Sequence, residues 1–109
     1  MTARQFRKMA LSLPEVEERA HMGHPDFRVG GKVFATLGYP DENWGMVKLT
    51  SEQQRVFAFA HPGVFVPAAG AWGRQGSTLI RLKLVSADVV QEAMRAAWLK
   101  RAPKRFIAL

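Results

Sequence analysis

The chain has 109 residues, of which 48% are hydrophobic and 23% are charged, and it contains no cysteine. This composition excludes an intrinsically disordered chain, a disulfide framework and a catalytic thiolate, and the length predicts a single domain over residues 1–109. The formal net charge of +7 arises wholly in the second half, since residues 1–54 hold seven Lys or Arg against seven acids and residues 55–109 hold nine against two.

This segregated positive charge indicates a polyanionic partner such as nucleic acid or anionic lipid, because a cationic surface concentrates polyanions. The chain has no run of about 18 apolar residues, and its N-terminus is amphipathic, with Arg4, Arg7 and Lys8 in place of a signal peptide. We therefore expect a soluble cytoplasmic protein that does not bind a membrane.

Residues 2–13 predict the first helix. Thr2 and Gln5 form a capping box, apolar residues then recur at helical spacing, and Pro14 ends the pattern. The next element is a β-hairpin.

Residues 26–37 predict this hairpin, because two β-rich runs flank Gly30-Gly31, a pair that tolerates the positive φ angles of a two-residue turn. In the expected register Phe27 lies opposite Phe34. Both faces of the hairpin hold apolar residues, so the sequence alone does not decide which face is buried.

The middle of the chain predicts alternating strands and helices. A strand is expected over residues 44–49, and a helix is expected through residue 60, with Ser51 and Gln54 as its capping box. Residues 64–66 predict a short extended piece.

The glycine-rich segment 70–76 surrounds Trp72 and Arg74 and predicts a loop. Two interpretations are open. In one, Trp72 is exposed beside Arg74 and the pair stacks a base or grips a phosphate. In the other, Trp72 fills the edge of the core while the glycines let the chain turn around it. The segment lacks the Lys-Ser/Thr ending of a P-loop, which argues against that type of nucleotide binding.

The last third of the chain predicts a strand and a long helix. Residues 78–84 alternate in polarity and place Arg81 and Lys83 on one side of the sheet. Ser86 caps the helix. Its buried stripe consists of Val90, Ala93, Met94, Ala97 and Trp98. Pro103 interrupts the helix and leaves residues 104–109 as a short basic tail or last turn.

Four cations, Lys100, Arg101, Lys104 and Arg105, occur within six residues at the end of this helix. One or two cations are enough to interact favourably with the helix dipole. The surplus favours an anion-binding role, and a solvated tail that improves solubility is the alternative. Antiparallel strands bracketed and interrupted by helices predict a two-layer α+β domain with helices covering one face of the sheet.

Several segments together resemble the MmcQ/YjbR family. They are LPEVEE at 13–18, GHPDFRVGGKVFA at 23–35, KL at 48–49, PGVFVP at 62–67, WGRQGST at 72–78, AW at 97–98 and APKR at 102–105. The match covers nearly the entire chain, and FRVGGKVFA is its most specific part. At Met22 this chain departs from the aromatic residue that the family often has.

The resemblance implies a CyaY-like or secretion-chaperone-like α+β fold, in which helices back an antiparallel sheet of about five strands. It also implies DNA binding, because members of the family are commonly labelled DNA-binding proteins.

No pattern of catalytic or metal-ligating residues stands out. Residues three apart on a strand point to opposite faces, so His21 and His24 are expected to be ordinary surface histidines. The acidic run at 15–18 is typical of a solvated turn, and Ser77 has neither a nearby His nor a nucleophile elbow. We expect no enzyme, no cofactor and no metal.

The sequence thus predicts a small non-enzymatic nucleic-acid-binding protein, with DNA as the expected partner and phosphates contacted by a basic surface. The expected contact residues are Trp72, Arg74, Arg81, Lys83, Lys100, Arg101, Lys104 and Arg105.

Two other functions remain open. One is a protein-interaction or chaperone-like adaptor that binds a protein partner, marked by exposed apolar side chains such as Phe27 and Phe34. The other is a small-molecule-binding protein or enzyme with Trp44, Trp72 and Tyr39 around a cleft.

Overall fold

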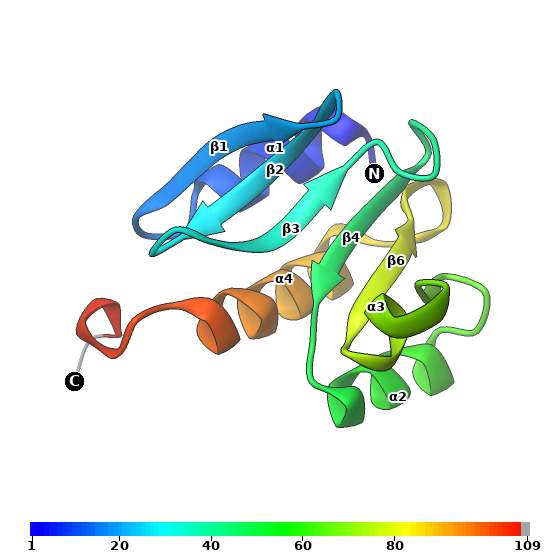
Figure 1. Cartoon of the computed structure of the whole chain (residues 1–109). Coiled ribbons are helices and arrows are strands. Elements are labelled where there is room, and N and C mark those ends of the chain that lie inside the picture. Colours follow the sequence, from blue (N-terminus) through cyan, green and yellow to red (C-terminus); the bar gives the residue numbers. More distant parts are fainter. Residues whose placement is uncertain (108–109) are drawn as a thin grey trace.

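The computed structural model describes residues 1–107 and shows one antiparallel sheet with helices packed against it (Figure 1). The strands are β1 (Val16–His21), β2 (His24–Val29), β3 (Lys32–Leu37), β4 (Trp44–Lys48), β5 (Phe65–Pro67) and β6 (Ser77–Arg81). The helices are α1 (Ala3–Leu11), α2 (Ser51–Ala60), α3 (Gly70–Arg74) and α4 (Ala87–Arg101), with short 3-10 turns η1 (Leu82–Leu84) and η2 (Lys104–Phe106). The six strands lie in the order β1-β2-β3-β4-β6-β5, which confirms the α+β class with one strand more than the five expected. Within residues 1–107, no helix is long and apolar enough to cross a membrane.

Helices α1 and α4 cover one face of the sheet and lie behind it in Figure 1. Helix α1 buries Phe6 and Ala10. Helix α4 buries the predicted stripe of Val90, Ala93, Met94, Ala97 and Trp98, which is confirmed. Helix α2 packs against β5, where the rings of Phe57 and Phe65 lie 5.0 Å apart. The short helix α3 lies in front of β6, on the opposite side of the sheet from α4 (Figure 1).

The predicted capping box of α1 is confirmed, with Thr2 and Gln5 bonded to each other's backbone amides. The capping box of α2 is formed by Thr50 and Gln53, so the prediction of Ser51 with Gln54 is wrong by one residue.

Gln54 is unavailable as a capping residue because its side chain is buried in the fold. Its Nε2 donates to the carbonyl oxygens of Gly73 at 2.9 Å and Ser77 at 3.1 Å. This side chain therefore ties α2 to the segment that carries α3.

The hairpin of β2 and β3 forms as predicted, but its register does not follow the simple pattern. Phe27 pairs with Ala35 and Arg28 pairs with Val33, so the expected pair of Phe27 and Phe34 is wrong. Phe34 is the extra residue of a β-bulge, which turns two consecutive side chains toward the core. Phe34 and Ala35 are both fully buried, so the bulge settles which face of the hairpin is inside.

The segment from Gly70 to Gly76 contains α3 where a loop was expected. Trp72 is 68% exposed, so the interpretation that it fills the core edge is wrong. A Cβ atom on Gly76 would lie 1.7 Å from the carbonyl oxygen of Leu49, and Gly76 has a φ of +103°. Only glycine fits this close approach.

The last strand is shorter than predicted, since β6 ends at Arg81 and Lys83 lies in η1. Leu82 is 2% exposed and its amide donates to the carbonyl oxygen of Asn43, which turns the chain out of the strand. Lys83 therefore does not project beside Arg81. Residues 108 and 109 of the predicted basic tail lie outside the described residues.

Candidate functional site

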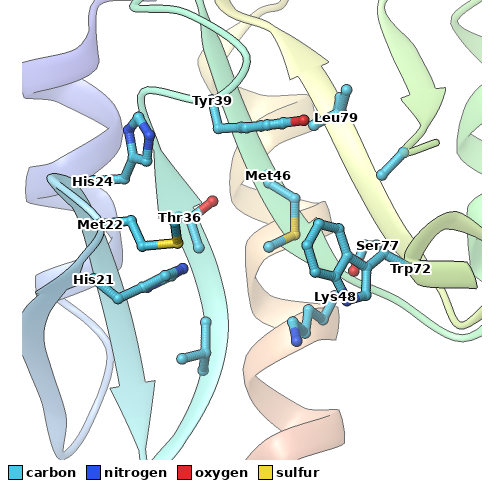
Figure 2. A pocket seen from close by; sticks show the side chains of 12 residues that line it. His21, Met22, His24, Thr36, Tyr39, Met46, Lys48, Trp72, Ser77 and Leu79 are labelled. Atoms are coloured by element: carbon cyan, nitrogen blue, oxygen red, sulfur yellow. The ribbon is translucent and has the colours of Figure 1, made fainter. Parts of the chain in front are cut away.

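The face of the sheet opposite α1 and α4 contains a cavity of about 570 Å³ and is called the open face (Figure 2). Its floor crosses three strands, because Thr36 of β3 pairs with Met46 of β4 and Met46 pairs with Leu79 of β6. Side chains alternate between the two faces of a strand. The neighbours Val47 and Ile80 accordingly point into the core, and the floor that remains is mainly apolar.

Two exposed aromatic side chains border this floor (Figure 2). Trp72 comes from α3 and is 68% exposed, and Tyr39 comes from the turn between β3 and β4 and is 50% exposed. The position of Trp72 is fixed by its neighbour Gly73, where a Cβ atom would lie 1.7 Å from the carbonyl oxygen of Ala68. The close packing of Gly73 holds α3 against the sheet, so Trp72 projects over the cavity.

The turn between β1 and β2 forms the third border, with His21 and His24 both lining the cavity. The expectation that they point to opposite faces is wrong, because they pair across the hairpin and do not lie on one strand. His24 meets Tyr39 edge to face, with the ring centroids 6.1 Å apart. Within the described range 1–107, no group of three His, Cys, Asp or Glu residues lies close enough together to hold a metal ion.

Behind the histidines lies a buried carboxylate. Asp26 is fully buried and accepts hydrogen bonds from Arg28 at 2.8 and 3.0 Å, and His21 Nδ1 lies 2.8 Å from its Oδ2. The hydrogen bonds from Arg28 outweigh the effect of burial and lower the pKa of Asp26 below its ordinary value. This ion pair orients His21 and neutralises Arg28, which removes Arg28 as a free cation on this face.

Three cations lie close together where β4 and α4 end and are called the cation cluster: Lys48, Lys100 and Arg101. Lys48 is the last residue of β4 and is the one cation among the residues that line the cavity. Lys100 Nζ donates to the carbonyl oxygen of Leu49 at 2.8 Å, which brings the last turn of α4 to the end of β4. Arg101 follows on the same helix, and its Nε is buried without a hydrogen-bond partner in the described part of the chain.

The charges in the cation cluster act on one another. Burial first, and the charge of Arg101 second, lower the pKa of Lys48 below its ordinary value. Burial, Arg101 and Lys48 together lower the pKa of Lys100 in the same direction. The ion pairs found within residues 1–107 all involve other cations, so the cluster carries a net positive charge.

The structure brings together some of the expected contact residues and separates others. Trp72 lines the cavity, whereas Lys100 and Arg101 lie near Lys48 without being part of the lining. Arg74 ends α3 next to Trp72 and is exposed but is not part of the lining. The remaining four expected contact residues do not line the cavity: Arg81, Lys83, Lys104 and Arg105.

Arg81 lies on the same sheet face, but its guanidinium covers the ring of Trp44 at 4.3 Å and its Nε donates to Gly63. Trp44 therefore supports Arg81 and does not line the cavity, unlike Tyr39 and Trp72.

Lys104 and Arg105 belong to η2 beyond Pro103, and the guanidinium of Arg105 lies 4.7 Å from the ring of Phe106. Pro103 packs against the hairpin turn, since a Cβ atom on Gly30 would lie 2.6 Å from it. Pro103 thus holds the chain against the hairpin just before the tail begins.

The exposed apolar residues expected of an adaptor, Phe27 and Phe34, are both fully buried. The sequence reasoning also missed Lys48, which stands alone in its strand without any charge motif. The alternation of Trp44, Met46 and Lys48 would have placed Lys48 on the open face once Val47 was assigned to the core.

The YjbR family model matches residues 11–100 of this chain, which confirms the resemblance carried by its motifs. The fold is similar to the crystal structure of the Deinococcus radiodurans protein DR2400, which contains a domain of the DUF419 family model. The two chains are 20% identical, the match covers 91% of this chain and 77% of the other, and the TM-score is 0.78. A comparison with curated proteins gives no match. The likeness to DR2400 establishes the fold alone.

Proposed function

The chain belongs to the YjbR family, and we propose that it binds single-stranded nucleic acid, with DNA as the expected partner, on the open face of its sheet. Bases stack on Trp72 and Tyr39 over the apolar floor, and the cation cluster contacts phosphates. The protein acts as a binding module without enzymatic activity.

The observation that carries this proposal is the pairing of two exposed aromatic rings with a cation at one cavity. Trp72 and Tyr39 border the floor from different segments, and Lys48 stands at its end (Figure 2). Stacking of a base on an aromatic side chain contributes about 1 to 3 kcal/mol and tolerates any base, because every base has a flat face. A ligand with flat apolar rings and regular negative charges matches this arrangement.

Charge supports a nucleic-acid partner over a neutral ligand. The chain has a net charge of +7, and the cation cluster has no paired carboxylate within residues 1–107. Phosphate contacts of this kind give affinity that depends on salt and little on base sequence. In a duplex the bases are already stacked and paired, so the recessed floor favours a single strand.

The proposal is tested by fluorescence anisotropy with an eight-residue oligothymidylate and a duplex of the same length at low salt. We expect the single strand to bind more tightly, and W72A to weaken its binding by about 10-fold or more because a stacking surface is lost. Phe59 provides a matched control, since it is an aromatic residue on α2 that is 88% exposed and does not line the cavity. Equal affinities for W72A and F59A, or no binding of the single strand, would refute the proposal.

A second candidate is docking of a protein partner on the same face. Met22, at the turn between β1 and β2, is 90% exposed beside the cavity, which adds an apolar side chain to the aromatic border. Apolar surface of this kind marks interaction sites. The discriminating variant is M22S, which should leave oligothymidylate binding within about 2-fold if Trp72 and Tyr39 provide the stacking.

A further inference from the structure

We propose that the cation cluster of Lys48, Lys100 and Arg101 is a binding site for a phosphate monoester, so that the open face prefers a nucleotide carrying a terminal phosphate to an internal segment of a strand. This inference rests on the proposed function, because the base of that nucleotide stacks at Trp72. The ligand chemistry is a base linked to a dianionic phosphate, whether at the end of a strand or in a free nucleotide.

The cluster lies near the point where two strands stop pairing. Strands β3 and β4 pair only from Ala35 to Leu37, opposite Val47 to Gly45, so they separate before β4 reaches Lys48 (Figure 1). The last turn of α4 reaches the end of β4 from the other side of the sheet, where Lys100 donates to the carbonyl oxygen of Leu49. The cations thus come from both layers of the fold, and Lys48 is the member of the cluster that lines the cavity.

Trp72 stands beside Lys48 of the cluster. Lys48 pairs with Ser77 on β6, and Ser77, Lys48 and Trp72 all line the cavity. Figure 2 shows Trp72 and Lys48 next to each other. A base stacked on Trp72 therefore has its phosphate on the side of the cation cluster.

Several hydrogen-bond donors of the cluster have no partner within residues 1–107. Lys100 uses one of its three ammonium donors for the carbonyl oxygen of Leu49. The Nε of Arg101 is buried and donates no hydrogen bond to any atom of residues 1–107. Buried donors in folded proteins are nearly always satisfied, so an unpaired buried Nε calls for an explanation. Phosphate oxygens are strong acceptors for arginine and lysine.

The helix dipole accounts for only part of the cluster. Cations at the end of a helix interact favourably with its C-terminal dipole, which suffices to explain Lys100 and Arg101. Lys48 belongs to β4, and burial together with the charge of Arg101 disfavours its charged form there. A bound anion would offset that repulsion and raise the pKa of Lys48 again.

The charge of the cluster favours a monoester over a diester. A phosphate monoester carries about −1.5 to −2 at pH 7 and presents three acceptor oxygens, whereas an internal diester carries a single negative charge. Three cations without a paired carboxylate match the more highly charged group.

The experiment compares oligothymidylates of eight residues that carry a 5′-phosphate, a 3′-phosphate or two hydroxyl ends, and adds thymidine and its 5′-monophosphate as competitors. Anisotropy at low salt on the full chain should give about 10-fold tighter binding for at least one phosphorylated end than for the hydroxyl oligomer. K48Q and R101Q should each reduce this ratio to about 1. K83Q is the matched control, because Lys83 lies in η1 outside the cavity, and it should leave the ratio unchanged.

The outcomes separate the inference from the proposed function. If all the oligomers bind equally, the monoester site is refuted and the proposed function stands. If none of the oligomers binds but the monophosphate binds more tightly than thymidine, the proposed function fails and the site takes a free nucleotide. If no phosphorylated compound is preferred and nothing binds, both fail. Circular dichroism of each variant confirms that it is folded, and K83Q shows how much the ratio changes when one positive charge is lost outside the cluster.

Discussion

Lys100 of α4 donates from Nζ to the backbone carbonyl oxygen of Leu49, 51 positions earlier in the chain, at 2.8 Å. This bond joins the end of the long helix to the end of β4 and brings Arg101 close to Lys48. The basic second half of the sequence thereby places charge beside a strand from the balanced first half.

Replacing Lys48 by methionine should stabilise the protein. Burial and the charge of Arg101 lower the pKa of Lys48 in the folded state, so folding disfavours its charged form. K48M should raise the free energy of unfolding at pH 7 by about 1 kcal/mol, which corresponds to a rise in Tm of about 5 °C.

The pH dependence of this difference follows from the sign of the shift. The unfolded chain keeps its proton up to about pH 10.4, while the folded protein loses it earlier, so the stability of the wild type rises with pH in that window. The advantage of K48M should shrink as the pH approaches 10. Thermal melts of both proteins at pH 7 and pH 9.5 measure it, and a K48M variant less stable than the wild type at pH 7 would contradict the prediction.

The contribution of the Asp26 carboxylate to the stability of the fold should decrease as the pH falls below about 4. Hydrogen bonds from Arg28, with a contribution from His21, lower its pKa in the folded state. Its stabilising effect is therefore complete above its ordinary pKa and is lost as the pH falls through the lower folded value. D26N should be about 2 kcal/mol less stable at pH 7, because a charge-assisted pair is lost, and its stability should change less than that of the wild type between pH 4 and pH 2. Acid titrations of the wild type and D26N measure both stabilities. If the difference between the two proteins does not shrink toward pH 2, Asp26 does not have this role.

Gly76 should tolerate no side chain. In G76A the new methyl group would meet the carbonyl oxygen of Leu49, the same atom that accepts from Lys100, and the φ of +103° is unfavourable for alanine. We expect a loss of about 3 kcal/mol or more in the free energy of unfolding.

The matched control is G31A, since Gly31 also has a positive φ of +80° but has no atom within 4 Å of an added Cβ. Only the backbone cost of about 1 to 2 kcal/mol should remain there. Urea denaturation of both variants measures the difference, and equal losses would show that the contact with Leu49 does not matter.

The number of phosphate contacts should be visible in the salt dependence. Three contacts by the cation cluster predict a slope of about −2 for log K against log salt with a single strand, and K48Q should reduce its magnitude by about 0.7. If the slope instead disappears when Lys104 and Arg105 are replaced and is unchanged in K48Q, the tail provides the attraction and the cluster does not.

Local sequence patterns predicted the elements whose determinants lie close together in the chain. The capping box of Thr2 and Gln5 and the buried stripe that ends in Trp98 depend on neighbours within one helix, and both are confirmed. The bulge at Phe34 turns two adjacent apolar residues, Phe34 and Ala35, into the core, which alternation alone does not encode.

The candidate site was predicted only in part, for the same reason. Trp72 was recognised from its glycine-rich surroundings, although its exposure depends on the close contact between Gly73 and Ala68. Lys48 and Arg101 lie more than fifty positions apart in the sequence, and no local pattern indicates that they meet.

The most direct measurement is the map of amide and side-chain chemical shifts of the labelled protein during titration with an eight-residue oligothymidylate. Binding on the open face predicts that the largest changes occur at the Trp72 indole and at Tyr39, Lys48 and Leu79, with little change on α2. Changes confined to residues 104–107, or to α2 around Phe59, would contradict the account.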